Sequence, residues 1–99
     1  MTLHALADTV QKARDQAKTI LRDLEKAGHP QTSESSGLYL SLVIIQKRLA
    51  NLRPGTSVVE FVAELEQLAR MCTDKLAPLK PLLDDAGRIA KGSRTGPAT

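Results

Sequence analysis

An unbroken heptad pattern of apolar residues near the start of the chain constrains the fold more than any other feature. Its members are spaced alternately three and four residues apart: Leu3, Leu6, Val10, Ala13, Ala17, Ile20, Leu24 and Ala27. This spacing gathers them along one side of an α-helix and does not fit the period of two that a strand requires. Gly28 is the residue type that most readily ends a helix, and Pro30 prevents an immediate restart. We therefore predict one long helix over residues 3–27 that packs along other helices.

A second helix is predicted over residues 38–53, where Pro54 and Gly55 end it. Its apolar positions again alternate in steps of four and three: Leu38, Leu42, Ile45, Leu49 and Leu52. A buried strand over residues 37–45 is the alternative, because Val, Ile and Tyr favour strands. The helical spacing continues beyond that segment and favours the helix. Residues 28–36, rich in Gly, Pro and Ser, are predicted to form a surface loop.

The second half of the chain predicts a third helix and a short fourth. Ser57 and Glu60 have the spacing of a capping box, which marks the start of the third helix. Its apolar positions are Val58, Phe61, Leu65, Leu68, Cys72 and Leu76. Pro81 is suited to opening a fourth helix that ends near residue 91. The short connection from residue 53 to 56 predicts that the second and third helices form an antiparallel hairpin.

These elements predict an all-α fold, a small helical bundle in one domain over residues 1–91 with a flexible basic tail over 92–99. The aromatic residues are only Tyr39 and Phe61, so the core is expected to be aliphatic. Cys72 is the single cysteine, which excludes an intramolecular disulfide and favours a reducing compartment. We find no signal peptide pattern and no apolar run long enough to span a membrane, so we expect a cytoplasmic location and no membrane contact.

No combination of residues forms a recognisable catalytic or metal-binding motif. His4 and Asp8 lie one turn apart, but two ligands are too few for a defined metal site. Cys72 has no neighbouring base in the sequence and is interpreted as a small core residue. Asp84 and Asp85 are adjacent on a predicted helix and diverge by about 100°. We therefore expect no enzymatic activity, no catalytic residues, no metal and no cofactor.

Nucleic-acid binding is an alternative, because the formal net charge is +3. The basic residues that would carry it are Arg14, Lys18, Arg22, Lys47 and Arg48, together with the basic tail over residues 92–99. Acidic residues are interspersed among those of the first helix, however, whereas DNA-binding domains usually gather bases on one face. A solvated helix surface is the simpler interpretation of this pattern.

Excess apolar surface on the second helix favours protein binding instead. Tyr39, Leu40, Val43 and Ile44 lie outside the stripe that the core uses, and their burial is worth about 1.5–3 kcal/mol each. Either neighbouring helices of the same chain or a second chain must cover them. We predict a homodimer through these four residues, with Ala13 and Ala17 offering a shallow place for close helix approach. The predicted function is that of a non-enzymatic protein-binding module, a small regulator such as an anti-activator or a chaperone-like protein that occludes a surface of another protein.

Overall fold

The computed structural model describes residues 2–52 and 58–95, and those residues are almost entirely helical. The elements in chain order are α1 (Thr2–Ala27), α2 (Thr32–Ala50), α3 (Glu60–Arg70), the short 3₁₀ helix η1 (Asp74–Leu79) and α4 (Lys80–Thr95). The described residues contain no strand, which confirms the all-α class and decides against a strand over residues 37–45. Ser57 of the predicted capping box and the last four residues of the predicted tail lie outside the described residues.

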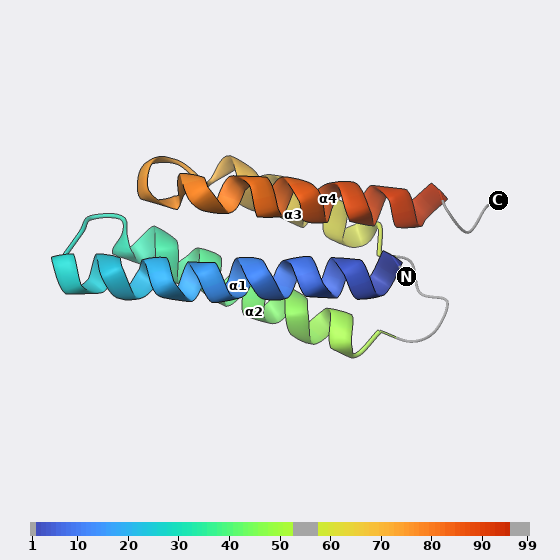
Figure 1. Cartoon of the computed structure of the whole chain (residues 1–99), viewed down its shortest axis with the longest axis horizontal. Helices are drawn as coiled ribbons and strands as arrows, with labels where there is room; N and C mark the ends of the chain where they lie inside the picture. Colours follow the sequence, from blue (N-terminus) through green and yellow to red (C-terminus); the bar gives the residue numbers. More distant parts are fainter. Residues whose placement is uncertain (1, 53–57, 96–99) are drawn as a thin grey trace.

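The four α-helices run alternately up and down (Figure 1). In that view α1 and α4 form the near layer and α2 and α3 the far layer. α1 packs against both α2 and α4, and α3 packs mainly against α4. α2 and α3 are antiparallel as predicted, but few of their residues approach closely. The junction between α2 and α3 is therefore the most open of the four junctions between neighbouring helices.

The end of α1 follows the prediction closely. Gly28 has a φ of 62°, the left-handed conformation that glycine adopts without a steric penalty. The His29 amide donates to the Leu24 carbonyl at 3.0 Å, and the Gly28 amide donates to the Glu25 carbonyl at 3.2 Å. These two hydrogen bonds form a Schellman motif, which satisfies the last carbonyl groups of the helix.

The predicted loop over residues 28–36 is wrong in its second half, because α2 already begins at Thr32. The Thr32 hydroxyl donates to the His29 carbonyl at 2.7 Å, and Glu34 places a negative charge in the first turn. Ser35 is fully buried, so a small side chain is what this packed turn of the helix can hold. The polar composition that suggested a loop reflects the start of a helix.

Gln31 ties the start of α2 to the segment that follows α3. Its side chain is 8% exposed, and its Nε2 donates to the Thr73 carbonyl at 3.2 Å. Its Oε1 accepts a hydrogen bond from the Lys75 amide at 3.0 Å. One glutamine therefore holds together two turns that are far apart in the sequence, which we call the Gln31 clamp.

The third helix is shorter than predicted and the fourth is longer. α3 ends at Arg70. A few residues later the backbone leaves the helical conformation, since Thr73 is extended and Asp74 has a φ of 52°. Cys72 and Leu76 are nevertheless buried, because η1 turns the chain back toward the core. α4 continues to Thr95, so the first four residues of the predicted tail are helical.

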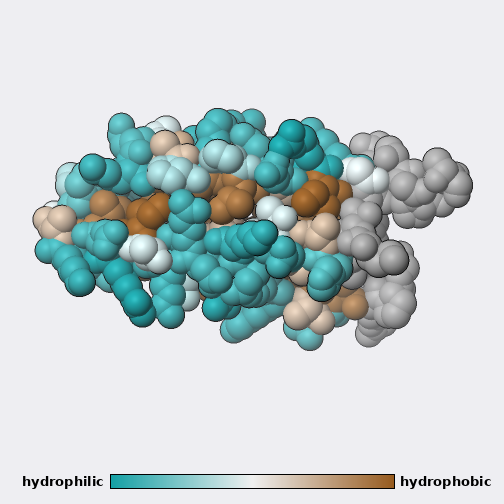
Figure 2. Space-filling view, viewed as in Figure 1, coloured by the Kyte–Doolittle hydropathy of each residue, from teal (hydrophilic) through white to brown (hydrophobic). Residues whose placement is uncertain are grey.

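The core is aliphatic apart from Phe61 and runs the length of the bundle. On the face seen in Figure 2, hydrophilic residues cover the outer sides of α1 and α4, and a hydrophobic band follows the junction between them. Four of the five predicted core positions of the second helix are confirmed, since Leu38, Leu42, Ile45 and Leu49 are buried. The fifth, Leu52, is partly buried and lies beyond the end of α2. None of the helices in the described ranges is long and apolar enough to cross a membrane.

Candidate protein-binding surface

The outer side of α2 carries large apolar side chains that the chain leaves in contact with solvent. Leu40 is 55% exposed and Ile44 is 56% exposed. Both lie on the side of α2 opposite Leu42 and Leu38, which are fully buried. The predicted excess of apolar surface is thus present at these two positions, and no other helix of the described chain covers it.

The other four predicted interface residues behave differently. Tyr39 and Val43 are partly buried, and Tyr39 packs against the edge of the core. Ala13 and Ala17 have no exposed surface, because α1 lies between α2 and α4 and uses these small residues for packing inside the bundle. The prediction that Ala13 and Ala17 offer a surface to a second chain is therefore wrong.

A groove of about 330 Å³ lies beside Ile44, where α2 and α3 diverge. Ser41, Ile44 and Arg48 line it from α2, and Glu64, Gln67 and Met71 line it from the side of α3. Met71 is 39% exposed, so it adds a flexible apolar side chain to the same surface as Ile44. The sequence analysis missed Met71. This residue does not share the spacing of the apolar positions of the third helix, which was an available sign that its side chain faces outward.

Arg48 adds a positive charge to the lining of this groove. Its guanidinium is 2.8 Å from Glu64 Oε1 and 3.1 Å from Glu60 Oε1, and it lies 4.6 Å from the centre of the Phe61 ring. The hydrogen bond that Arg48 donates to Glu64 is the largest cause that raises the pKa of Arg48 above its ordinary value. Arg48 therefore connects α2 to α3 within the chain.

The residues of the nucleic-acid alternative do not form a common site. Arg48 is engaged as described, and Arg14 donates to Gln46 Oε1 at 2.7 Å across the α1–α2 junction. Gln46 in turn donates to Gln11, so Arg14 belongs to a polar network between the two helices. Lys18, Arg22 and Lys47 are exposed. Only these three of the five predicted basic residues are both exposed and outside any ion pair or side-chain hydrogen bond among the described residues.

Cys72 is buried and behaves as the predicted core residue. Its Sγ donates to the Leu68 carbonyl at 3.3 Å. Burial raises the pKa of the Cys72 thiol to about 11, so the thiol is protonated at neutral pH. A nucleophilic cysteine needs the opposite shift.

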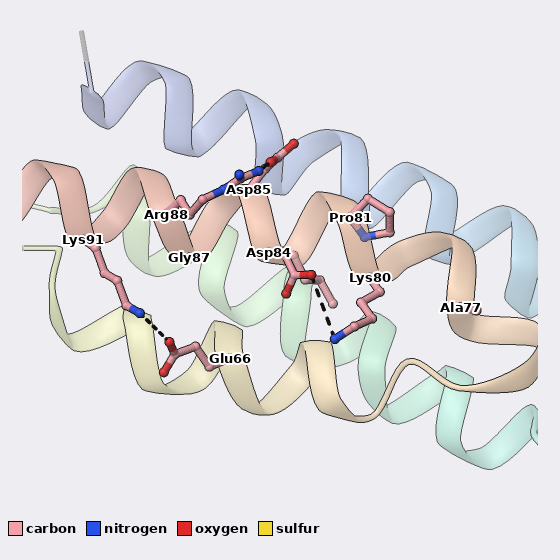
Figure 3. Close-up of a pocket in the computed structure, with 10 residues that line it drawn as sticks. Glu66, Ala77, Lys80, Pro81, Asp84, Asp85, Gly87, Arg88 and Lys91 are labelled. Atoms are coloured by element: carbon pink, nitrogen blue, oxygen red, sulfur yellow. Dashed lines mark ion pairs between the residues drawn. The ribbon is translucent and has the colours of Figure 1, made fainter.

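A second and more polar groove lies between α3 and α4, with a volume of about 710 Å³. Figure 3 shows Lys91 of α4 reaching Glu66 of α3, and Asp84 and Asp85 pointing to different sides of α4. The Lys91 ammonium is 2.8 Å from Glu66, and this hydrogen bond lowers the pKa of the Glu66 carboxyl. Asp84 pairs with Lys80 at 3.9 Å, and Asp85 pairs with Arg88. Each of these carboxylates contacts a Lys or Arg, and Asp84 and Asp85 point apart, so they do not converge as two carboxylates placed for general acid–base catalysis.

Metal binding has no support from the described residues, among which no group of three His, Cys, Asp or Glu side chains converges. His4 is exposed, and its sequence neighbour one turn on, Asp8, lies 3.4 Å from Lys12. Comparison of the chain with protein-family models, with curated proteins and with solved structures finds no match. The case for function therefore depends on the surface of the chain itself.

Proposed function

We propose that this chain is a protein–protein interaction module that acts by contact, not by catalysis, and that binds through the outer side of α2. The observation that supports this is the exposure of Leu40 and Ile44, each more than half accessible, in a bundle whose other large aliphatic side chains are mostly packed. Covering the exposed half of each side chain is worth roughly 1 kcal/mol or more. Such a surface is typical of a binding site when it adjoins a groove with polar edges.

The form of the surface supports a helical partner. The α2–α3 groove adjoins Ile44 and Met71, and Gln67 and Ser41 supply hydrogen-bonding groups along its sides. An amphipathic helix binds such a groove with its apolar side. A small chain of this kind acts as a regulator or a chaperone-like protein by occluding a helical or dimerising surface of its partner, and we propose that it also associates with itself. We also propose a cytoplasmic location, because the single cysteine of the sequence, Cys72, is a free thiol.

Capture of partners from the native host tests the proposal. The bait is the intact chain, compared with its Leu40→Asp and Ile44→Asp variants. Ala63→Asp is the matched control, because Ala63 is exposed on α3 and does not line the groove. We expect a protein that the wild type and the control retain and that both α2 variants lose. Retention of the same proteins by all four baits would contradict the proposal.

The nucleic-acid alternative is tested with the same preparations. Lys18 and Arg22 are exposed on α1 and take part in no ion pair within the described residues. Binding that depended on them would shift duplex mobility at low salt and weaken steeply as salt rises. A salt-sensitive shift lost in a Lys18→Glu, Arg22→Glu variant, with no specific protein captured, would replace the favoured function.

A further inference from the structure

Six exposed residues form a stripe along one side of α2 and its C-cap residue, Asn51. They are separated by alternating steps of four and three: Ser33, Gly37, Leu40, Ile44, Lys47 and Asn51, which we call the α2 stripe. All six are exposed. This is the spacing that brings two helices together over several turns. It lies on the side of α2 turned away from the core, so neither α1 nor α3 stands in front of it.

From this stripe we infer that α2 pairs with α2 of a second copy of the same chain, in an antiparallel arrangement centred between Leu40 and Ile44. The inference rests on the proposed function, because it concerns the same surface and names one occupant for it. A two-fold axis at that centre sets each residue of the α2 stripe opposite another member of the stripe in the second copy.

The residue types match in this register. Leu40 lies opposite Ile44 of the second copy, so the two largest apolar residues cover each other twice. Gly37 lies opposite Lys47, which places the aliphatic part of a long side chain over the residue with none. A Cβ added to Gly37 would meet nothing within 4 Å, so its own chain leaves the space above this residue open. Ser33 lies opposite Asn51, and both can form hydrogen bonds.

The charges favour the antiparallel arrangement over the parallel one. α2 carries Glu34 near its start and Lys47 near its end, and neither is in an ion pair within the described residues. In the antiparallel pair Glu34 lies about 4.5 Å along the helix axis from Lys47 of the second copy, at 1.5 Å per residue, which a lysine side chain spans. A parallel pair would instead set Lys47 against Lys47 and Gly37 against Gly37. The parallel pair would therefore bring two positive charges together at Lys47 and leave unfilled space between the two glycines at position 37.

Mixed disulfide formation tests the register directly. We would mix two variants of the full chain, Gly37→Cys and Lys47→Cys, distinguishable by mass, under mild oxidation. The antiparallel pair predicts a cross-link between the two variants and little within either one, because equivalent Gly37 positions are separated by about 15 Å along the axis. A disulfide needs Cα atoms within about 7 Å. The wild type is the control, since its Cys72 is buried and protonated.

Sedimentation equilibrium at tens of micromolar gives the second readout. We expect a dimer for the wild type and for Ala63→Asp, and a monomer for Leu40→Asp. Circular dichroism should show that the Leu40→Asp monomer is still folded. Lys47→Glu should weaken the dimer roughly 2- to 30-fold, the loss of two exposed ion pairs. Glu34→Lys together with Lys47→Glu should restore it.

Three results would overturn the pairing: a monomeric wild type, cross-links within Gly37→Cys alone, or failure of the double charge exchange to restore association. Any of these leaves the proposed function to the capture experiment. A dimer with the predicted cross-link, in a chain that captures no α2-dependent partner, would refute the proposed function and retain the self-pairing.

Discussion

Replacement of Gln31 tests what holds the chain together at one end of the α2–α3 junction, the most open junction of the bundle. The Gln31 clamp joins the start of α2 to the Thr73 carbonyl and the Lys75 amide, just beyond the end of α3. Gln31→Ala removes both hydrogen bonds. Each is worth about 0.5–1.5 kcal/mol net, so we expect a loss of about 1–3 kcal/mol in the free energy of unfolding. This is a large part of the stability of a small domain.

Gln31→Glu separates the two hydrogen bonds. A carboxylate still accepts from the Lys75 amide but cannot donate to the Thr73 carbonyl, and it sets two oxygens against each other. We expect this variant to be no more stable than Gln31→Ala, although the two side chains of Gln and Glu have nearly the same shape. Gln67→Ala is the control, because Gln67 is an exposed glutamine on α3. It should change the free energy of unfolding by less than about 0.5 kcal/mol.

Urea unfolding followed by circular dichroism measures the global effect, and amide hydrogen exchange at Lys75 measures the local one. The clamp predicts that both fall together: a lower urea midpoint with an unchanged slope, and faster exchange of the Lys75 amide. A Gln31→Ala variant as stable as the wild type, with Lys75 protected as before, would refute the assignment of a stabilising role to the clamp.

Three further predictions test the packing. Leu42→Ala should cost about 2–5 kcal/mol, whereas Leu40→Ala should change the stability of the monomer by less than about 0.5 kcal/mol, as measured by urea unfolding below the association range. Gly28→Ala should cost about 1 kcal/mol or more because of its positive φ, whereas Gly87→Ala, in a helix with open space for a Cβ, should stabilise by about 0.5–1 kcal/mol. The buried Cys72 thiol should react with a disulfide reagent only as fast as the chain opens. Because burial raises the pKa of Cys72 to about 11, the folded state keeps a proton that the unfolded state loses, and the free energy of unfolding should fall as pH rises from about 9 to about 11. Cys72→Ala should remove that part of the decline.

The sequence predicts a helix boundary well where one residue decides the conformation. Gly28 is such a residue, since the left-handed turn at the end of α1 is one that other residues adopt at a cost. The start of α2 depends instead on tertiary contact. Ser35 is a poor helix residue in isolation, yet it is fully buried where α2 packs into the bundle. Local composition does not reveal that contact.

The end of α3 shows why apolar spacing alone is insufficient. Cys72 and Leu76 continue the steps of the third helix and are both buried, but a break at Thr73 and a 3₁₀ turn carry them into the core. The burial of Cys72 and Leu76 was thus predicted correctly, although α3 ends before either residue. Pro78 was the available signal, because a proline in an α-helix clashes with the carbonyl four residues earlier, that of Asp74.

Spacing along the sequence also fails to distinguish residues that pack inside the bundle from residues that face outward. The sequence assigned Leu40 and Ile44 to a second chain because they lie outside the apolar stripe of the second helix. It assigned Ala13 and Ala17 because small residues allow close helix approach. Small residues on a long helix are what close packing within a bundle requires, so the fold itself explains Ala13 and Ala17, which are fully buried.

Leu40 and Ile44 have no such explanation within the chain. A polar residue at either position would leave the core untouched, because Leu38 and Leu42 already supply the buried side of α2. Gly37 on the same stripe also weakens an exposed helix without meeting any neighbour. Two large exposed apolar side chains and a glycine that weakens the helix thus lie together on one side of α2. A surface of this composition gains stability when another helix covers it, and this is the physical ground on which we propose contact with a second chain.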